Sequence, residues 1–129
     1  MGHRTRGALR CLLAGAALLL AAAPTRAADV EAGKTVFNRC KACHRLEANA
    51  PAALGPNLHG IFGRKAGTID GFNYSEAMKQ SGVVWDDDTL QKYLSDPKAF
   101  VPGNKMAFPG VKNDTEMANL IAYLKQATQ

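Results

Sequence analysis

The sequence predicts a small all-α domain with unusually long loops. Four stretches of the 129-residue chain have the apolar spacing of amphipathic helices, and none shows the alternation of a half-buried strand. Between the first two of these helices lies an irregular stretch rich in Gly and Pro, residues 46–73. Helices this short, with so much loop, can hardly close a hydrophobic core by themselves. A large apolar group at the centre of the domain would complete that core.

The first residues have the composition of a secretory signal peptide. Three arginines precede an apolar run at residues 11–23, and the small residues Thr25 and Ala27 follow at the −3 and −1 positions of a cleavage site. The run is shorter than the roughly 20 residues that a membrane anchor needs, which disfavours a retained anchor. We therefore expect a cleaved segment, residues 1–27, and one domain, residues 28–129.

Cleavage changes both the charge and the cysteine content. The whole chain has 16 basic and 11 acidic residues and a net charge of +5. Four of the arginines belong to residues 1–27, so the remaining 102 residues have a net charge of +1. Net charge therefore gives no support for nucleic-acid binding. Cys11 leaves with the signal, and the exported domain keeps only Cys40 and Cys43.

The first three helices are predicted from caps and apolar faces. Residues 30–40 form the first, with Asp29 as N-cap. A short helix follows at residues 75–80. Residues 86–94 form the third, capped by Asp86 and ended before Pro97, whose ring cannot continue a helix.

One further turn and a long last helix complete the prediction. Asp96 and Pro97 start a turn that runs through Phe100. Residues 114–127 form the last helix, where Asn113 and Glu116 have the spacing of a capping box. Its apolar stripe consists of Met117, Leu120, Ile121 and Leu124.

Two cysteines and a histidine in "CKACH" define the chemistry. Cys40, Cys43 and His44 suit a redox dithiol, a zinc site or a covalently held haem. A redox C-x-x-C normally starts a helix after a strand, whereas this one follows a helical pattern. Zinc would need four ligands, and His59 is the single further candidate. The C-x-x-C-H spacing is typical of c-type haem attachment, in which the histidine is the proximal iron ligand.

The opposite face of the iron needs a second ligand or stays open. The candidates are Met78, Met106, Met117 and His59. Met117 lies on the apolar stripe of the last helix, Met78 suits packing, and His59 suits a surface turn. Met106 lies in a loop flanked by Pro and Gly, "PGNKMAFPG", which favours it as the ligand over a role as loop filler.

Further motifs follow in order along the chain: "GPNLHG", "FGRKAG", "GFNYSEA", "YLSDPKAFVPGNKM" and "LIAYLK". With "CKACH" they resemble class I cytochrome c, of the short, mitochondrial-like type also found in bacteria. The resemblance spans nearly all of residues 28–129. It implies a cytochrome c fold of four to five helices and long loops around one haem c, covalently bound through Cys40 and Cys43.

The resemblance also implies roles for individual residues. His44 and Met106 would be the axial ligands, and the Pro56 carbonyl would accept a hydrogen bond from the His44 ring. Around a buried propionate it would gather Tyr74, Trp85, Arg64 and Asn104. Buried carboxylates need such donors.

Three more expectations concern the surroundings of these residues. Tyr93 would lie on the Met106 side. Gly33 and Phe37 would pack against the last helix at Leu120 and Tyr123. Two positions depart from the usual mitochondrial pattern: Met78 replaces a common asparagine and Asn104 a common threonine.

The resemblance implies a soluble, monomeric, periplasmic one-electron carrier that is not an enzyme. Its default partners would be a cytochrome bc complex as donor and a cytochrome c oxidase as acceptor, with a photosynthetic reaction centre or a periplasmic dehydrogenase as other possibilities. Basic residues near the haem edge would dock these partners: Lys34, Arg39, Lys98, Lys105 and Lys112. The competing interpretation is a haem-based sensor, ligand-binding or peroxidatic protein with an open sixth coordination site.

Overall fold

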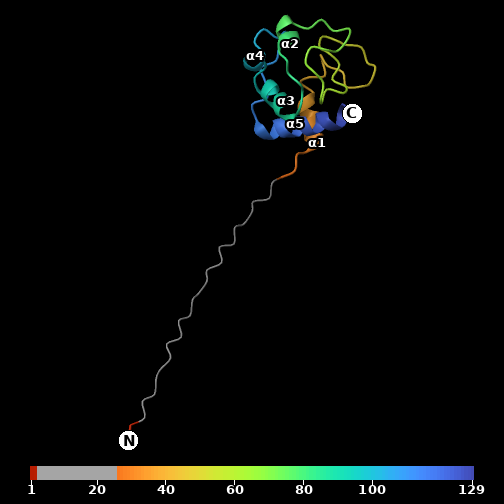
Figure 1. The fold of residues 1–129 in the computed structure, drawn as a ribbon. Coiled ribbons are helices and arrows are strands. Elements are labelled where there is room, and N and C mark those ends of the chain that lie inside the picture. Colours follow the sequence, from red (N-terminus) through yellow and green to blue (C-terminus); the bar gives the residue numbers. More distant parts are fainter. Residues whose placement is uncertain (3–25) are drawn as a thin grey trace.

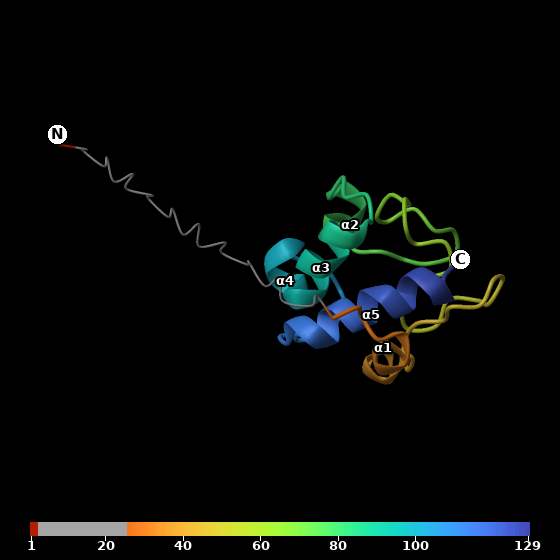
Figure 2. The same ribbon diagram turned by 90° about the horizontal axis from the view of Figure 1, so that it is seen from below.

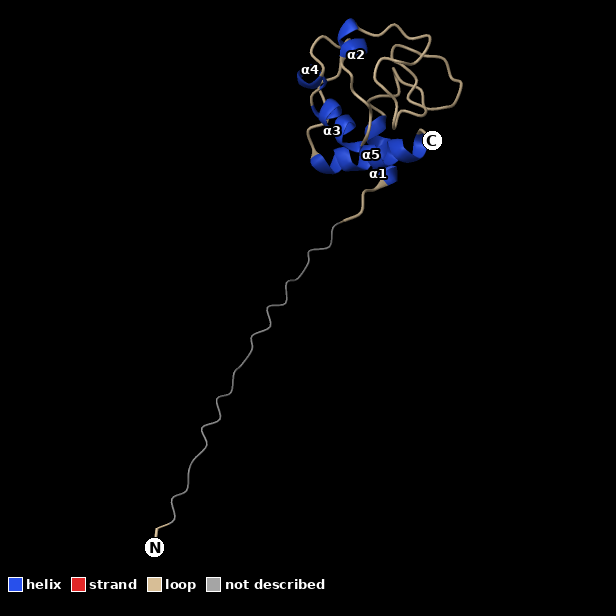
Figure 3. Cartoon of the chain, viewed as in Figure 1, coloured by secondary structure: helices blue, strands red, loops and turns tan. Residues whose placement is uncertain are grey.

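The computed structural model describes residues 1–2 and 26–129, so the predicted signal peptide, residues 1–27, lies almost entirely outside the described part. Within that part the chain forms five helices joined by long loops (Figures 1 and 3). They are α1 (Val30–Phe37), α2 (Glu76–Gln80), α3 (Asp87–Ser95), α4 (Pro97–Phe100) and α5 (Asp114–Ala127). The β pairing among the described residues is one isolated bridge, Lys65–Val84. The all-α prediction is confirmed.

α1 is capped as expected but ends earlier. The Asp29 carboxylate accepts a hydrogen bond from the Ala32 amide at 3.0 Å. The prediction that this helix reaches residue 40 is wrong, because α1 ends at Phe37. The next three amides bond to carbonyls three residues back, which is the tighter 3₁₀ spacing. The Cys43 and His44 amides then both bond to the Cys40 carbonyl, so the C-x-x-C-H segment is a compact turn.

The first and last helices of the domain cross in close contact. Figure 2 shows α1 end-on beneath α5, which is seen from the side. Gly33 permits this approach: a Cβ there would lie 2.0 Å from the Asn119 carbonyl oxygen and 2.8 Å from Tyr123 Cβ. The Phe37 and Tyr123 rings pack with their centroids 5.6 Å apart. The crossing fixes the orientation of the segment that follows α1.

The capping box predicted for α5 is half formed. Asn113 accepts a hydrogen bond from the Glu116 amide at 2.9 Å, as a cap should. The Glu116 carboxylate does not return to the cap residue, however. It binds the Arg39 guanidinium through two hydrogen bonds, of 2.9 and 2.8 Å. A complete box instead starts α3, between Asp86 and Thr89.

Loops position the remaining core residues. Trp85 is held by backbone hydrogen bonds, because its amide donates to the Arg64 carbonyl and its carbonyl accepts from the Gly63 amide. After α4 the chain returns along α3, where the Val111 amide donates to the Leu94 carbonyl at 2.8 Å. No helix of the described residues is long and apolar enough to cross a membrane.

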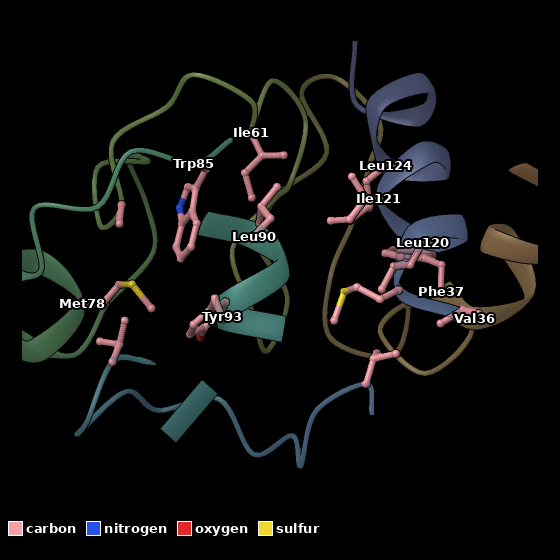
Figure 4. Packing of buried hydrophobic residues seen from close by; sticks show 14 residues of the cluster. Val36, Phe37, Ile61, Met78, Trp85, Leu90, Tyr93, Leu120, Ile121 and Leu124 are labelled. Carbon is pink, nitrogen blue, oxygen red and sulfur yellow. The ribbon is translucent and has the colours of Figure 1, made fainter. Parts of the chain in front are cut away.

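The buried apolar side chains form one cluster, and Figure 4 shows that some of them lie on α1 and α5 and others around α3. Phe37, Leu120 and Leu124 lie where α1 meets α5. Trp85 and Tyr93 belong to the part around α3. Residues from both places, among them Phe37, Leu120, Trp85 and Tyr93, line one cavity.

Candidate functional site

The cavity has a volume of about 370 Å³ and a predominantly apolar wall. Among the residues that the structure describes, its lining includes Arg39, Arg64 and Lys105 as charged residues and no Asp or Glu. It brings together nine of the ten residues predicted to bind the cofactor: Cys40, Cys43, His44, Pro56, Arg64, Tyr74, Trp85, Tyr93 and Met106. The tenth, Asn104, is buried just outside the wall. Residues separated by more than 60 positions in the sequence therefore meet around one space.

Cys40, Cys43 and His44 form one side of the cavity. Both thiols are free and half-buried. Burial raises the pKa of the Cys40 thiol, an effect that the nearby Arg39 charge opposes. Burial also lowers the pKa of the His44 imidazole, against the opposing hydrogen bond to Pro56. A neutral imidazole is the form that coordinates a metal.

The orientation of the His44 ring is fixed by Pro56 and Gly55. Its Nδ1 atom lies 2.8 Å from the Pro56 carbonyl oxygen, so Nδ1 carries the proton and Nε2 keeps a free lone pair. Gly55 leaves room for the ring, because a Cβ there would lie 2.5 Å from His44 Cε1. Proline and glycine therefore fix the ring orientation together, as the outer partners of metal-binding histidines commonly do.

A zinc centre at this segment lacks sufficient ligands. Among residues 1–2 and 26–129, no group of three or more His, Cys, Asp or Glu side chains is arranged to hold a metal ion. His59, the fourth zinc candidate in the sequence, does not line the cavity. The donors at Cys40 and His44 therefore face an apolar space and not a closed polar cage.

Hydrogen-bond donors gather at another part of the wall. Trp85 is buried and lines the cavity, and its indole N–H is a hydrogen-bond donor. Arg64 and Tyr74 line the same cavity, and burial raises the pKa of Tyr74, an effect that the Arg64 charge opposes. The Arg64 guanidinium also donates to the His59 and Asn57 carbonyls. This part of the cavity offers donors that an anionic group could use.

Met106 enters the cavity from a tightly held loop. The Tyr93 hydroxyl donates to the Met106 sulfur at 3.9 Å, and burial raises the Tyr93 pKa to about 12. Asn104, 4% exposed, accepts from the Met106 amide and donates to the Pro97 and Val101 carbonyls. Asn104 thus positions the loop backbone beside Met106.

The five basic residues expected to dock partners are all exposed, but the side chains of four of them form an ion pair or a hydrogen bond within the domain. Arg39 pairs with Glu116. The ammonium groups of the other three donate to backbone carbonyls: Lys98 to Asn104, Lys105 to Asn73 and Lys112 to Ser95. The lysines keep their charge in these bonds, whereas the charge of Arg39 is locally compensated.

Comparison with known proteins agrees with this geometry. The family model for cytochrome c matches residues 30–128.

The chain belongs to the cytochrome c family.

It is 48% identical over 122 residues to cytochrome c2 of Rhodomicrobium vannielii, covering 95% of this chain and 96% of that protein. It is 50% identical over 98 residues to cytochrome c-550 of Nitrobacter winogradskyi, covering 76% and 90%. The solved structure of cytochrome cH from Methylobacterium extorquens superposes with a TM-score of 0.71 at 45% identity, covering 76% of this chain and 98% of that one.

The cavity fits the haem c of this family. Cys40 and Cys43 supply the two thiols of a C-x-x-C-H attachment, and the chain carries one covalent haem c there. The His44 imidazole and the Met106 thioether suit the iron, the apolar wall suits the ring, and the Trp85 indole N–H suits a propionate. Two supporting residues were missed by the sequence reasoning, Gly55 and Asn57. Both residues belong to the motif "GPN", on either side of Pro56, whose carbonyl was predicted to accept a hydrogen bond from His44.

Proposed function

We propose that this cytochrome c is a soluble, periplasmic one-electron carrier with His44 and Met106 as the axial haem ligands. The observation that carries the proposal is the presence of both side chains in one apolar cavity with the attachment cysteines. Relatives named cytochrome c2 and cytochrome c-550 support an electron-carrier role. The bound haem supplies reversible exchange of one electron between ferric and ferrous iron.

His44 and Met106 would hold the haem iron, and the apolar wall would exclude water from it. A thioether from Met106 favours the ferrous state, and an apolar wall disfavours the extra charge of the ferric site. The Tyr93 hydroxyl donates to the sulfur, and the Pro56 carbonyl orients His44. If both residues bind the iron, no coordination site would remain for a substrate, which is why we propose a carrier and not an enzyme.

The exported form would consist of residues 28–129 after removal of residues 1–27. The charged start, the apolar run and the small residues before Asp29 support this division. Haem attachment through two thiols also suits a compartment outside the cytoplasm. The default partners are a cytochrome bc complex and a cytochrome c oxidase, and a reaction centre or a periplasmic dehydrogenase would use the same chemistry.

The protein would act as a monomer. Its positive side chains would steer it toward acidic patches of its partners, and these side chains are Lys34, Arg39, Lys98, Lys105 and Lys112. Neutralising Lys98 and Lys105 to glutamine tests this idea, because glutamine keeps a donor for the Asn104 and Asn73 carbonyls. We expect slower reaction with the partner at low salt and a shallower salt dependence. An unchanged rate and salt slope would refute steering by these lysines.

The carrier function is tested with reduced holoprotein and membranes of the organism that encodes it. We expect fast, cyanide-sensitive oxidation that depends on salt. Slow oxidation by active membranes would exclude the oxidase as partner. Carbon monoxide tests the ligation: ready binding to the reduced protein at neutral pH would contradict Met106 ligation and favour a sensor, ligand-binding or peroxidatic protein.

A further inference from the structure

Asp70 and Gly71 form the one pair in the 129-residue sequence in which glycine directly follows Asp or Asn. Both residues are exposed and lie in a turn between α1 and α2. Gly71 has a φ of 79°, which glycine adopts without steric cost. A Cβ placed on it would meet no atom within 4 Å beyond its chain neighbours. The backbone that follows Asp70 is therefore open.

The two groups of this pair that can react with each other are held by few contacts. Among residues 26–129, the Asp70 carboxylate forms no ion pair, and the Gly71 amide donates to no backbone carbonyl. Other turn glycines differ in this respect, because the Gly60 amide donates to the Thr128 carbonyl at 2.6 Å. The Gly71 nitrogen can thus approach the Asp70 carboxyl carbon without breaking such a bond.

These conditions favour the spontaneous isomerisation of aspartate. The Gly71 backbone nitrogen attacks the carboxyl carbon of protonated Asp70 and forms a C–N bond. The proton of the nitrogen and the hydroxyl of the carboxyl group leave together as water, and a succinimide ring remains. Water then adds to the ring carbonyl that belonged to the Asp70 backbone and breaks its bond to nitrogen. The chain now continues through the side chain, as isoaspartate, and no oxidant or metal is consumed.

The segment after this pair forms part of the cavity wall. Phe72 and Tyr74 both line the cavity, and their rings pack edge to face with centroids 4.9 Å apart. The Lys105 ammonium donates to the Asn73 carbonyl at 2.9 Å, which ties this segment to the loop that carries the proposed iron ligand. Isoaspartate adds one methylene carbon to the backbone just before Phe72, so these residues cannot all keep their places.

We propose that Asp70 is a modification site, at which spontaneous isoaspartate formation displaces the part of the cavity wall that contains Tyr74. The reaction uses only the chain's own groups and water, so the proposal does not depend on the proposed carrier function. Asp114 is the informative comparison, because it is exposed as well but precedes Thr115 within α5. There the β-branched side chain and the helical backbone both hinder the attack.

The test follows heavy oxygen from labelled water into the haem-loaded protein, kept at physiological temperature and mildly acidic pH. Each hydrolysis of the succinimide adds one oxygen atom from the solvent. Trypsin cuts after Lys65 and Lys79 and releases residues 66–79 as one peptide, in which mass spectrometry locates the label. A synthetic peptide of the same residues gives the rate without the fold. Asp70→Glu is the matched variant, since it keeps the charge but cannot close a succinimide ring.

We expect label at Asp70 in the folded protein at a rate within about tenfold of that in the peptide, which corresponds to a local opening cost below about 1.4 kcal/mol. Label at Asp114 should appear at least about tenfold more slowly, because opening of the helix must precede the reaction. Asp70→Glu should gain none at residue 70. The isomerised protein, separated by ion exchange, should have a Tm roughly 4–8 °C below that of Asp70→Glu, the decrease expected when one hydrogen bond is lost.

Three results would overturn the proposal. A folded protein that stays unlabelled while the peptide becomes labelled would show that the turn is protected. Equal labelling at Asp70 and Asp114 would show that exposure, and not the following glycine, sets the rate. An isomerised protein with the Tm and the absorption spectrum of Asp70→Glu would show that the cavity wall keeps its place.

Discussion

Replacement of Gly33 by alanine tests how tightly α1 and α5 are packed. The added Cβ would lie 2.0 Å from the Asn119 carbonyl oxygen, about 1.4 Å inside the roughly 3.4 Å of ordinary contact. The obstacle is helix backbone, which cannot rotate away as a side chain can. Helix propensity alone would make the change favourable by about 1 kcal/mol. Overpacking costs typically about 1–3 kcal/mol, and more where backbone must move.

The steric cost should exceed the gain in helix propensity, because moving α1 more than 1 Å away from α5 would separate the whole contact between the two helices. We expect Gly33→Ala to lower the free energy of unfolding by about 2 kcal/mol. For a domain of this size that corresponds to a Tm decrease of roughly 8–16 °C.

Circular dichroism of the haem-loaded protein during thermal and denaturant unfolding would measure this change. Thr35→Ala is the matched control, since it places alanine at an exposed position of the same helix and should change stability by less than about 0.5 kcal/mol. A Gly33→Ala protein as stable as the wild type, or more stable, would refute the close crossing.

Three further perturbations have defined outcomes. Hydrogen bonds from Thr89 lower the pKa of Asp86, so its capping contribution is present above about pH 4 and is lost as pH falls through the lowered pKa; Asp86→Asn, which also caps, should match the wild type at pH 7 and lose less stability in acid-unfolding titrations. Asn104→Ala leaves the Met106 amide without its acceptor and should cost about 2 kcal/mol in denaturant unfolding; it should also increase carbon monoxide binding, and unchanged stability would contradict the buried network. Cys40→Ala with Cys43→Ala removes haem attachment and leaves a cavity worth up to about 9 kcal/mol at roughly 24 cal/mol per Å³; the chain should then show no cooperative unfolding transition, and a sharp one would refute a haem-completed core.

Features that depend on neighbouring residues could be predicted from the sequence. The caps Asp29, Asp86 and Asn113 accept amides within three residues, so a short pattern contains the whole interaction. The C-x-x-C-H segment is local in the same sense. The need for a central group also followed from the sequence, because the helices were too short and the loops too long for an independent core.

Features that depend on distant residues could not be predicted from the sequence. Glu116 has the spacing of a capping box but binds Arg39, 77 residues away, because a bidentate guanidinium contact competes with the return to the cap. The early end of α1 depends on how residues 38–40 tighten toward the cavity, which apolar spacing does not reveal. The contact of Gly55 with the His44 ring likewise appears only once the loop is folded.

The α1–α5 crossing can form only after nearly the whole domain has been synthesised. The Asp29 amide donates to the Asn119 side chain, 90 residues away, so the first helix of the domain waits for the last. At about 5–20 residues per second, a growing chain needs roughly 5–18 s to supply that partner. During this interval the crossing cannot fix the segment after α1. The same holds for the exported chain: the two thiols stay accessible for attachment until the last helix of the domain has joined the first.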